Sequence, residues 1–327
     1  MSTTGTRTGC DLRRTGATRH SRRAVPSTLR VHLALITVSV LFGAHFVFTK
    51  QILAAVPAKS WVLFRIGAAM VLIVPLAMCL RRQRGMPGLR TWFALAIASL
   101  FGVVLNQVLF TEGMALTTPE HSAVVNSCIP TWTLIVATIV GQERLRRRKV
   151  LAILSALAGV LYLLGIDRIL TGEVQGFGSE TLVGDLLSAG NGLAFAIHLV
   201  MMRKIGRSLD PWTTTAILFV QGTLMIALWS GPSIEAAHVE AAVLPPILWF
   251  ALYTVLASTV LTYLLNTWAL RHTNSSNVAL YINVQPIVAA ALNFAMGAPV
   301  PGHRFFVALA LVALGLWLQT SAKRVDG

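Results

Sequence analysis

Long apolar stretches recur along the whole chain and are separated by short polar segments that contain Arg, Pro, Asn or Gly. A helix that crosses the hydrocarbon core of a bilayer needs roughly 20 mostly apolar residues. Ten stretches approach this length, at 31–53, 60–80, 91–112, 121–140, 150–165, 183–202, 212–230, 245–268, 276–297 and 305–320. The pattern therefore predicts an all-α integral membrane protein with ten transmembrane helices.

The composition supports this interpretation. Of the 327 residues, 55% are hydrophobic and only 12% are charged, and the mean hydropathy is +0.70. Soluble domains of ordinary composition carry about twice that share of charged residues. The three cysteines show neither a disulfide framework nor a metal-ligand spacing, so we expect no metal site and no cofactor.

The net charge of +15 comes from 27 basic residues. With the N-terminus in the cytoplasm, most of them fall in cytoplasmic segments, only Lys59, Arg168 and Arg304 fall on the opposite side, and Lys50 and Arg65 lie within helices. This asymmetry is the positive-inside pattern. It predicts a multi-pass protein of the cell (inner) membrane with both termini cytoplasmic. No basic stretch is interleaved with a nucleic-acid motif, so we expect no nucleic-acid partner.

The first 30 residues are rich in Arg and Thr and contain one acid, Asp11. We interpret residues 1–30 as a basic, disordered cytoplasmic tail, with a transit peptide or a start codon assigned too far upstream as alternatives.

The second half of the chain repeats the first. A shift of 156 residues places Pro130 on Pro286, Gly141 on Gly297 and Gly159 on Gly315. Because each copy holds five predicted helices, an odd number, the copies enter the membrane in opposite directions, as in many transporters. We expect repeats at 31–165 and 183–320, a non-cytoplasmic connecting loop at 166–182, and a cytoplasmic C-terminal tail at 321–327.

Several segments carry a family resemblance. The second half contains "ALRHTNSSNVALYINVQP", and the first contains "PTWTLIVATIVGQERL", "FGAHFVFTK" and "SWVLFRIGAAM". The chain resembles the drug/metabolite transporter superfamily in its EamA-like branch. The resemblance implies two five-helix repeats, secondary transport of small metabolites and export as the preferred direction. It also implies a recurrent glutamate, here Glu143, with a structural role.

Polar side chains within the predicted helices are costly in lipid and should face the bundle interior. The candidates for a substrate cavity are Asn106, Gln107, Asn126, Asn191, His198, Tyr263, Asn266, Tyr281, Asn283 and Gln285. The alternative for each one alone is a hydrogen bond between packed helices, worth about 0.6 kcal/mol.

Two prolines and three charged residues have further interpretations. Pro130 and Pro286 are expected to kink their helices and to take part in gating, with simple packing as the alternative. Lys50, Arg65 and Glu112 lie toward the outer ends of three helices and could form an outer charge cluster. Snorkelling of the two bases to the interface is the alternative.

No Asp or Glu lies deep in a predicted span. We therefore expect neutral, zwitterionic or anionic substrates, such as amino acids or their derivatives, rather than lipophilic cations. His45 and His198 are the candidates for proton coupling, although a membrane histidine is more often a packing residue.

Other classes of membrane protein fit less well. No nucleotide-binding loop or known catalytic motif occurs, which disfavours a pump and a membrane-embedded enzyme. A membrane-embedded enzyme without a recognisable catalytic motif and a passive channel stay alternatives. The sequence predicts an alternating-access carrier whose partners are a small-molecule substrate and the lipid bilayer, with monomer or homodimer left open.

Overall fold

The computed structural model describes residues 28–80, 87–143, 147–163, 180–205, 209–273 and 275–321, and this part of the chain is helical without strands. Nearly all of the predicted N-terminal tail and most of the predicted connecting loop lie outside the described residues.

The first half contains α1 (Thr28–Leu53), α2 (Ala58–Leu80), α3 (Leu89–Ser99), the π-helical segment η1 (Leu100–Leu105), α4 (Asn106–Leu116), α5 (Pro119–Asn126), α6 (Ile129–Ile139) and α7 (Arg147–Leu163). The second contains α9 (Glu180–Ile205), α10 (Pro211–Ser230), η2 (Gly231–Ser233), α11 (Ala236–Val243), α12 (Ile247–Val255), the π-helical segment η3 (Leu256–Leu261), α13 (Thr262–Leu270), α14 (Ser275–Leu280), the short 3₁₀ segment η4 (Tyr281–Val284), α15 (Gln285–Ala295) and α16 (His303–Ser321).

Within the described residues, seven helical stretches are long and apolar enough to cross a membrane: Leu29–Leu53, Ala58–Leu80, Leu89–Leu116, Pro119–Ile139, Glu180–Ile205, Pro211–Ser230 and Ile247–Leu270. Val150–Leu163 and His303–Gly315 are shorter apolar helices. The predicted span 276–297 is interrupted by η4, so it does not form one long helix. The all-α membrane fold is thus confirmed.

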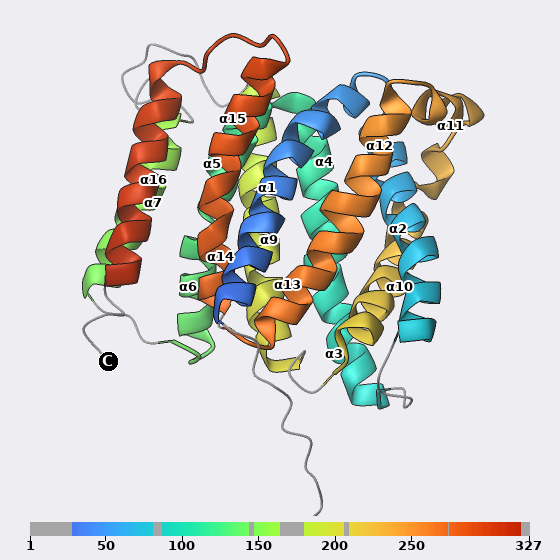
Figure 1. Ribbon diagram of the computed structural model, residues 1–327, viewed down its shortest axis with the longest axis horizontal. Helices are drawn as coiled ribbons and strands as arrows, with labels where there is room; N and C mark the ends of the chain where they lie inside the picture. The colour runs from blue at the N-terminus through green and yellow to red at the C-terminus, as the bar shows by residue number, and fades with distance from the viewer. Residues whose placement is uncertain are drawn as a thin grey trace, which may run out of the picture.

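The helices form one bundle around α1 and α9 (Figure 1). α1 contacts α12, α13 and α15, while α9 contacts α4, α5 and α6. α7 and α16 pack on each other at one edge of the bundle, and α2 and α10 at the other. The first residues of α1 and the last of α16 lie at the same end of the bundle, the lower end in Figure 1.

The duplication extends to the backbone. The shift of 156 residues places η1 on η3 and α6 on α15, with identical first and last positions. Gly141 and Gly297 follow these two helices with φ of 71° and 93°, a left-handed conformation that glycine adopts without strain. Each closes its helix with the same pattern, because Gln142 N–H donates to Ala137 O at 2.7 Å and Ala298 N–H donates to Asn293 O at 3.1 Å.

The two prolines begin helices and do not kink them. α5 ends at Asn126 and α6 begins at Ile129, so Pro130 lies in the first turn of a new helix, and Pro286 has the same place in α15. The missing proline N–H has no partner to lose in a first turn. In place of the predicted kinks, a short irregular segment precedes each proline helix: a two-residue turn before α6 and the 3₁₀ segment η4 before α15.

Candidate functional site

A small cavity of about 40 Å³ lies at the centre of the bundle. It is lined by Phe42, His45, Phe46, Asn106, Gln107, Phe110, Asn126, Ile129, Asn191, Phe195, Ile282 and Gln285, which come from both halves of the chain. A cavity of this size holds a few water molecules and no metabolite. The described conformation therefore leaves no room for a metabolite at this point.

Helix irregularities position the amide groups of this lining. Asn106 and Gln107 follow η1, Asn126 is the last residue of α5, and Gln285 is the first residue of α15. Breaks and π-helical turns within membrane helices are tolerated where the freed backbone groups face protein or a cavity, and π-helical turns often mark functional positions. The local backbone thus brings four amides to one depth.

The amides form a directed hydrogen-bond chain. Gln107 Nε2 donates to Asn106 Oδ1 at 2.7 Å and to the Tyr263 hydroxyl at 2.9 Å. The Tyr263 hydroxyl donates to Gly102 O, a carbonyl of η1, at 2.5 Å. Asn191 Nδ2 donates to Asn106 O at 2.6 Å, which ties α9 to the same point. These hydrogen bonds hold the Gln107 amide with its oxygen turned toward α2.

Arg65 meets that oxygen. Its side chain is 0% exposed, NH2 donates to Gln107 Oε1, and NH1 donates to His45 Nε2 at 2.6 Å. The guanidinium carbon lies 5.8 Å from the centre of the Phe110 ring, and Nε has no hydrogen-bond partner. Among the described residues no Asp or Glu pairs with Arg65. Burying an ion without a counterion costs several kcal/mol, so this arrangement is unusual for a merely structural arginine.

The hydrogen bonds of His45 fix its protonation. An arginine only donates, so His45 Nε2 must accept from it and the ring proton must lie on Nδ1. Nδ1 lies 3.1 Å from the Ser258 hydroxyl, which itself donates to Thr254 O at 2.9 Å. His45 is thus neutral while Arg65 binds it. It can accept a proton on Nε2 only after the guanidinium moves away.

Aromatic rings also line the cavity. The His45 and Phe110 rings stack with centroids 5.1 Å apart, and Phe46 meets Phe110 edge-on at 5.3 Å. Phe42 and Phe195 also line the cavity. The candidates named from the sequence include no phenylalanine, because an apolar side chain facing a cavity has the same sequence pattern as one facing lipid.

Half of the candidate cavity residues lie outside the lining. His198 packs against Gly102, with Nδ1 donating to Ala98 O at 2.8 Å. Tyr263 lies behind Gln107, and Tyr281 bonds to His32 of α1. Asn266 and Asn283 are likewise absent from the lining residues.

The expected outer charge cluster is not formed by ion pairs within the described part of the chain. Lys50 Nζ donates to the carbonyls of Met114 (3.1 Å), Ala115 (3.1 Å) and Thr117 (2.7 Å) at the end of α4. A cation at a helix C-terminus satisfies carbonyls that have no partner within the helix. Arg65 points instead to His45 and Gln107, and Glu112 Oε1 has no hydrogen-bond partner.

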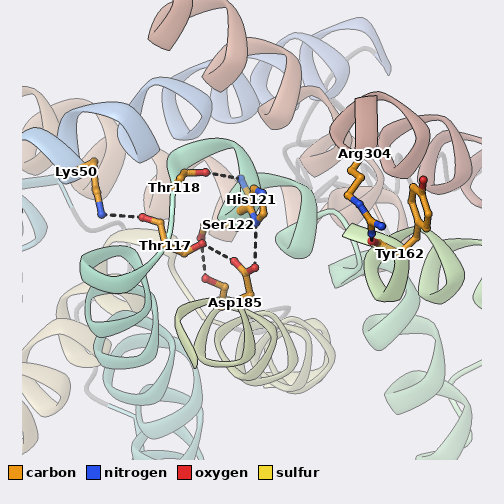
Figure 2. A network of polar contacts seen from close by, with 9 residues as sticks. Lys50, Thr117, Thr118, His121, Ser122, Tyr162, Asp185 and Arg304 are labelled. Atoms are coloured by element: carbon orange, nitrogen blue, oxygen red, sulfur yellow. Dashed lines mark hydrogen bonds and ion pairs between the residues drawn. The ribbon is translucent and has the colours of Figure 1, made fainter. Parts of the chain in front are cut away.

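A second polar network ties the helices together near the last residues of α1 (Figure 2). Asp185 of α9 is 2% exposed, accepts from the Thr117 hydroxyl at 2.5 Å and meets His121 Nδ1 at 3.0 Å. The Ser122 and Ser188 hydroxyls, on α5 and α9, lie 2.8 Å apart. Asp185 has no functional role predicted from the sequence, because it stands in the first turn of a predicted helix, where acids are common.

A vestibule of about 510 Å³ adjoins this network, with Lys50, Glu120, His121, Asn293 and Arg304 among its lining residues. Glu120 of α5 accepts a hydrogen bond from Asn293 of α15. Arg304 lies over the Tyr162 ring at 4.6 Å (Figure 2). Helices of both halves are thus held together on this side of the cavity.

The EamA-like transporter family model matches the chain twice, over residues 29–165 and over residues 182–321. These matches take in all the residues of the cavity lining. The chain belongs to the EamA-like transporter family. As an EamA-like transporter it is a multi-pass membrane protein whose partners are the lipid bilayer and a small-molecule substrate.

Similar proteins from distant organisms agree with this assignment. The "Uncharacterized transporter YyaM" of Bacillus subtilis is 24% identical over 91% of this chain and 95% of its own. An "Uncharacterized transporter" of Archaeoglobus fulgidus is 24% identical over 89% and 98%. A WAT1-related protein of Arabidopsis thaliana is 22% identical over 81% and 70%. The relatives named for an activity are transporters and not enzymes.

The fold also has a counterpart among solved structures. A crystal structure whose title reads only "Crystal structure of protein" superposes with a TM-score of 0.65 at 18% identity, over 91% of this chain and 99% of that chain. This likeness concerns the fold alone.

Proposed function

We propose that this EamA-like transporter is a secondary carrier that moves small metabolites through the central cavity by alternating access. The observation that carries the proposal is the cavity itself, in which five amide side chains and four phenylalanine rings from both halves converge. Amides and rings in one cavity suit a small molecule with polar and apolar parts. Because the cavity is too small for such a molecule, the halves must separate to admit it.

The proposed architecture is ten crossings in two inverted five-helix repeats, with domain bounds at 31–165 and 183–320. The pairing of α7 with α16 supports it. A Cβ on Gly159 would lie 2.8 Å from Ala308 O, and a Cβ on Gly315 would lie 2.6 Å from Ala152 O. The shift of 156 converts each contact into the other. Such reciprocity is typical of two elements related by a two-fold axis.

The proposed orientation puts both termini in the cytoplasm of a cell (inner) membrane, as the distribution of basic residues indicates. The polar network around Asp185 then lies on the non-cytoplasmic side. We propose that it forms the outer gate and that the breaks before Pro130 and Pro286 are the points at which the helices bend. Export is the proposed direction.

Counterflow in proteoliposomes tests the carrier mechanism. Vesicles preloaded with one unlabelled amino acid or amino-acid derivative at a time are mixed with a trace of the same labelled compound. A carrier accumulates label transiently and saturably, with trans-stimulation. Uptake that is unsaturable and insensitive to the internal compound would identify a channel and overturn the proposal.

The direction is tested in cells with toxic amino-acid analogues. An exporter raises growth resistance when expressed, and the double variant Asn106→Leu/Gln285→Leu, which removes two cavity amides, should lose that resistance. Increased sensitivity on expression would indicate import.

A further inference from the structure

Arg65 carries a positive charge in the wall of the proposed transport site, and nothing in the described residues neutralises it. Both of its hydrogen-bonded partners, His45 and Gln107, are neutral, and both line the cavity. Its Nε atom is buried and unpartnered. The guanidinium therefore lies one layer behind the cavity surface, held there by two residues that a substrate would touch.

The geometry of Arg65 favours one kind of partner. A guanidinium presents its donors in a planar fork that matches a carboxylate through two parallel hydrogen bonds, and these charge-assisted bonds are stronger than those to neutral acceptors. A carboxylate in the cavity would thus displace the imidazole or the amide oxygen from Arg65. Neither displaced group is left stranded, because His45 Nε2 and Gln107 Oε1 can both accept from an amino or hydroxyl group.

The rest of the cavity narrows the chemistry further. Within the described lining the remaining side chains are uncharged amides, phenylalanines and isoleucines. One cation and no second basic group suit a single negative charge better than a phosphate dianion. The rings of Phe42, Phe46, Phe110 and Phe195 suit an apolar or aromatic body.

We propose that the transported substrate is a small organic acid with one carboxylate and an apolar side chain, zwitterionic amino acids included. Arg65 binds the carboxylate of this substrate. The inference rests on the proposed transport function and assigns its substrate class. It gives Arg65 a specificity-determining role in place of the outer gating role that the sequence indicates.

The test compares acids with their amides in counterflow. Purified full-length protein in proteoliposomes is assayed with radiolabelled L-amino acids and 2-oxo acids, each against its primary amide. The variants are Arg65→Gln, Arg65→Lys, which keeps the charge but not the fork, and Lys59→Gln as the matched control. Lys59 is an exposed basic residue of the same helix, above the Trp229 ring.

The wild type should take up acids in preference to amides. Arg65→Gln should lower kcat/KM for the acids by roughly tenfold to a hundredfold, the loss expected for a charge-assisted contact, while uptake of the amides stays within about twofold. Arg65→Lys should fall between, and Lys59→Gln should match the wild type. Thermal unfolding in detergent checks that each variant is folded.

Three results overturn the inference. If the wild type takes up amides as well as acids, the transporter does not recognise the carboxylate. Equal losses for acid and amide in folded Arg65→Gln would show a structural role. Inhibition by inorganic phosphate as strong as that by the unlabelled acid would show a site for inorganic anions. If Arg65→Gln does not fold, the inference is judged by the preference of the wild type for acids over amides and by the uptake of acids by Arg65→Lys. If the wild type takes up no acid and no amide, the transport proposal itself fails and this inference falls with it.

Discussion

At the scale of single residues, the chemistry of the cavity depends on which group holds the proton and which holds the charge. His45 accepts from Arg65 and is neutral, whereas His198 donates to a backbone carbonyl behind η1. Only His45 can change its partner when a substrate binds. If protons are coupled to transport, they should enter through His45.

This distinction predicts different pH profiles for two variants. His45→Gln should abolish the pH dependence of counterflow, because glutamine keeps an acceptor for Arg65 but does not titrate. His198→Gln should retain the wild-type profile, since that ring does not line the cavity. The measurement is counterflow rate from acidic to alkaline pH. An unchanged profile in both variants removes the histidines as proton carriers.

Gly102 gives a stability prediction at the same scale. A Cβ there would overlap the His198 ring, so Gly102→Ala must displace the ring from Ala98 O and should lower the free energy of unfolding by about 1–3 kcal/mol. Gly67→Ala is the control, because its Cβ meets only Thr223 Cγ2 at 4.0 Å. Thermal unfolding in detergent measures both. Equal melting temperatures would contradict the packing described for η1.

At the scale of elements, the sequence predicted the membrane helices and their duplication. The length of the apolar stretches and the equivalent positions of Pro130 and Pro286 can both be seen in the sequence itself. It did not predict η1 and η3, although they occupy equivalent positions in the two repeats. Their sequences, "LFGVVL" and "LASTVL", share no pattern that separates a π-helical turn from an ordinary helix. The two π-helical segments pack against Tyr263, His198 and His45. These residues are distant in the sequence, so a local pattern does not reveal the contacts.

The same limit applies to Arg65. The sequence predicted that Arg65 lies within a helix, and it does, but a helix position does not tell which neighbour the side chain meets. The amide residues Asn106, Gln107, Asn126, Asn191 and Gln285 were found because polar groups in lipid are costly. The phenylalanines were not, since lipid and cavity both accept them.

The reciprocal contact between α7 and α16 predicts matched effects at this scale. Gly159→Ala and Gly315→Ala each push a Cβ into a backbone carbonyl of the partner helix and should destabilise the protein by similar amounts, about 1–3 kcal/mol. Thermal unfolding of the two variants side by side is the measurement. A large loss in one and none in the other would argue against the two-fold relation of this pair.

At the scale of the whole molecule, polar contacts join the two halves on one side of the narrow cavity, the side that we propose to be the outer one. Asp185 of the second half binds Thr117 and His121 of the first, and Glu120 binds Asn293. Alternating access requires these contacts to break once in each cycle. Holding them closed should therefore stop transport without unfolding the protein.

A disulfide across this gate tests the central claim most directly. The Ser122 and Ser188 hydroxyls are 2.8 Å apart on α5 and α9, so Ser122→Cys/Ser188→Cys can link the two halves in a chain whose native cysteines are replaced. In a second protein that also carries Gln285→Cys, an impermeant maleimide applied from either side reports access to the cavity. We predict that oxidation stops counterflow in the first protein and outer labelling in the second, and that reduction restores each. Outer labelling or counterflow that persists with the disulfide formed would contradict alternating access through this cavity.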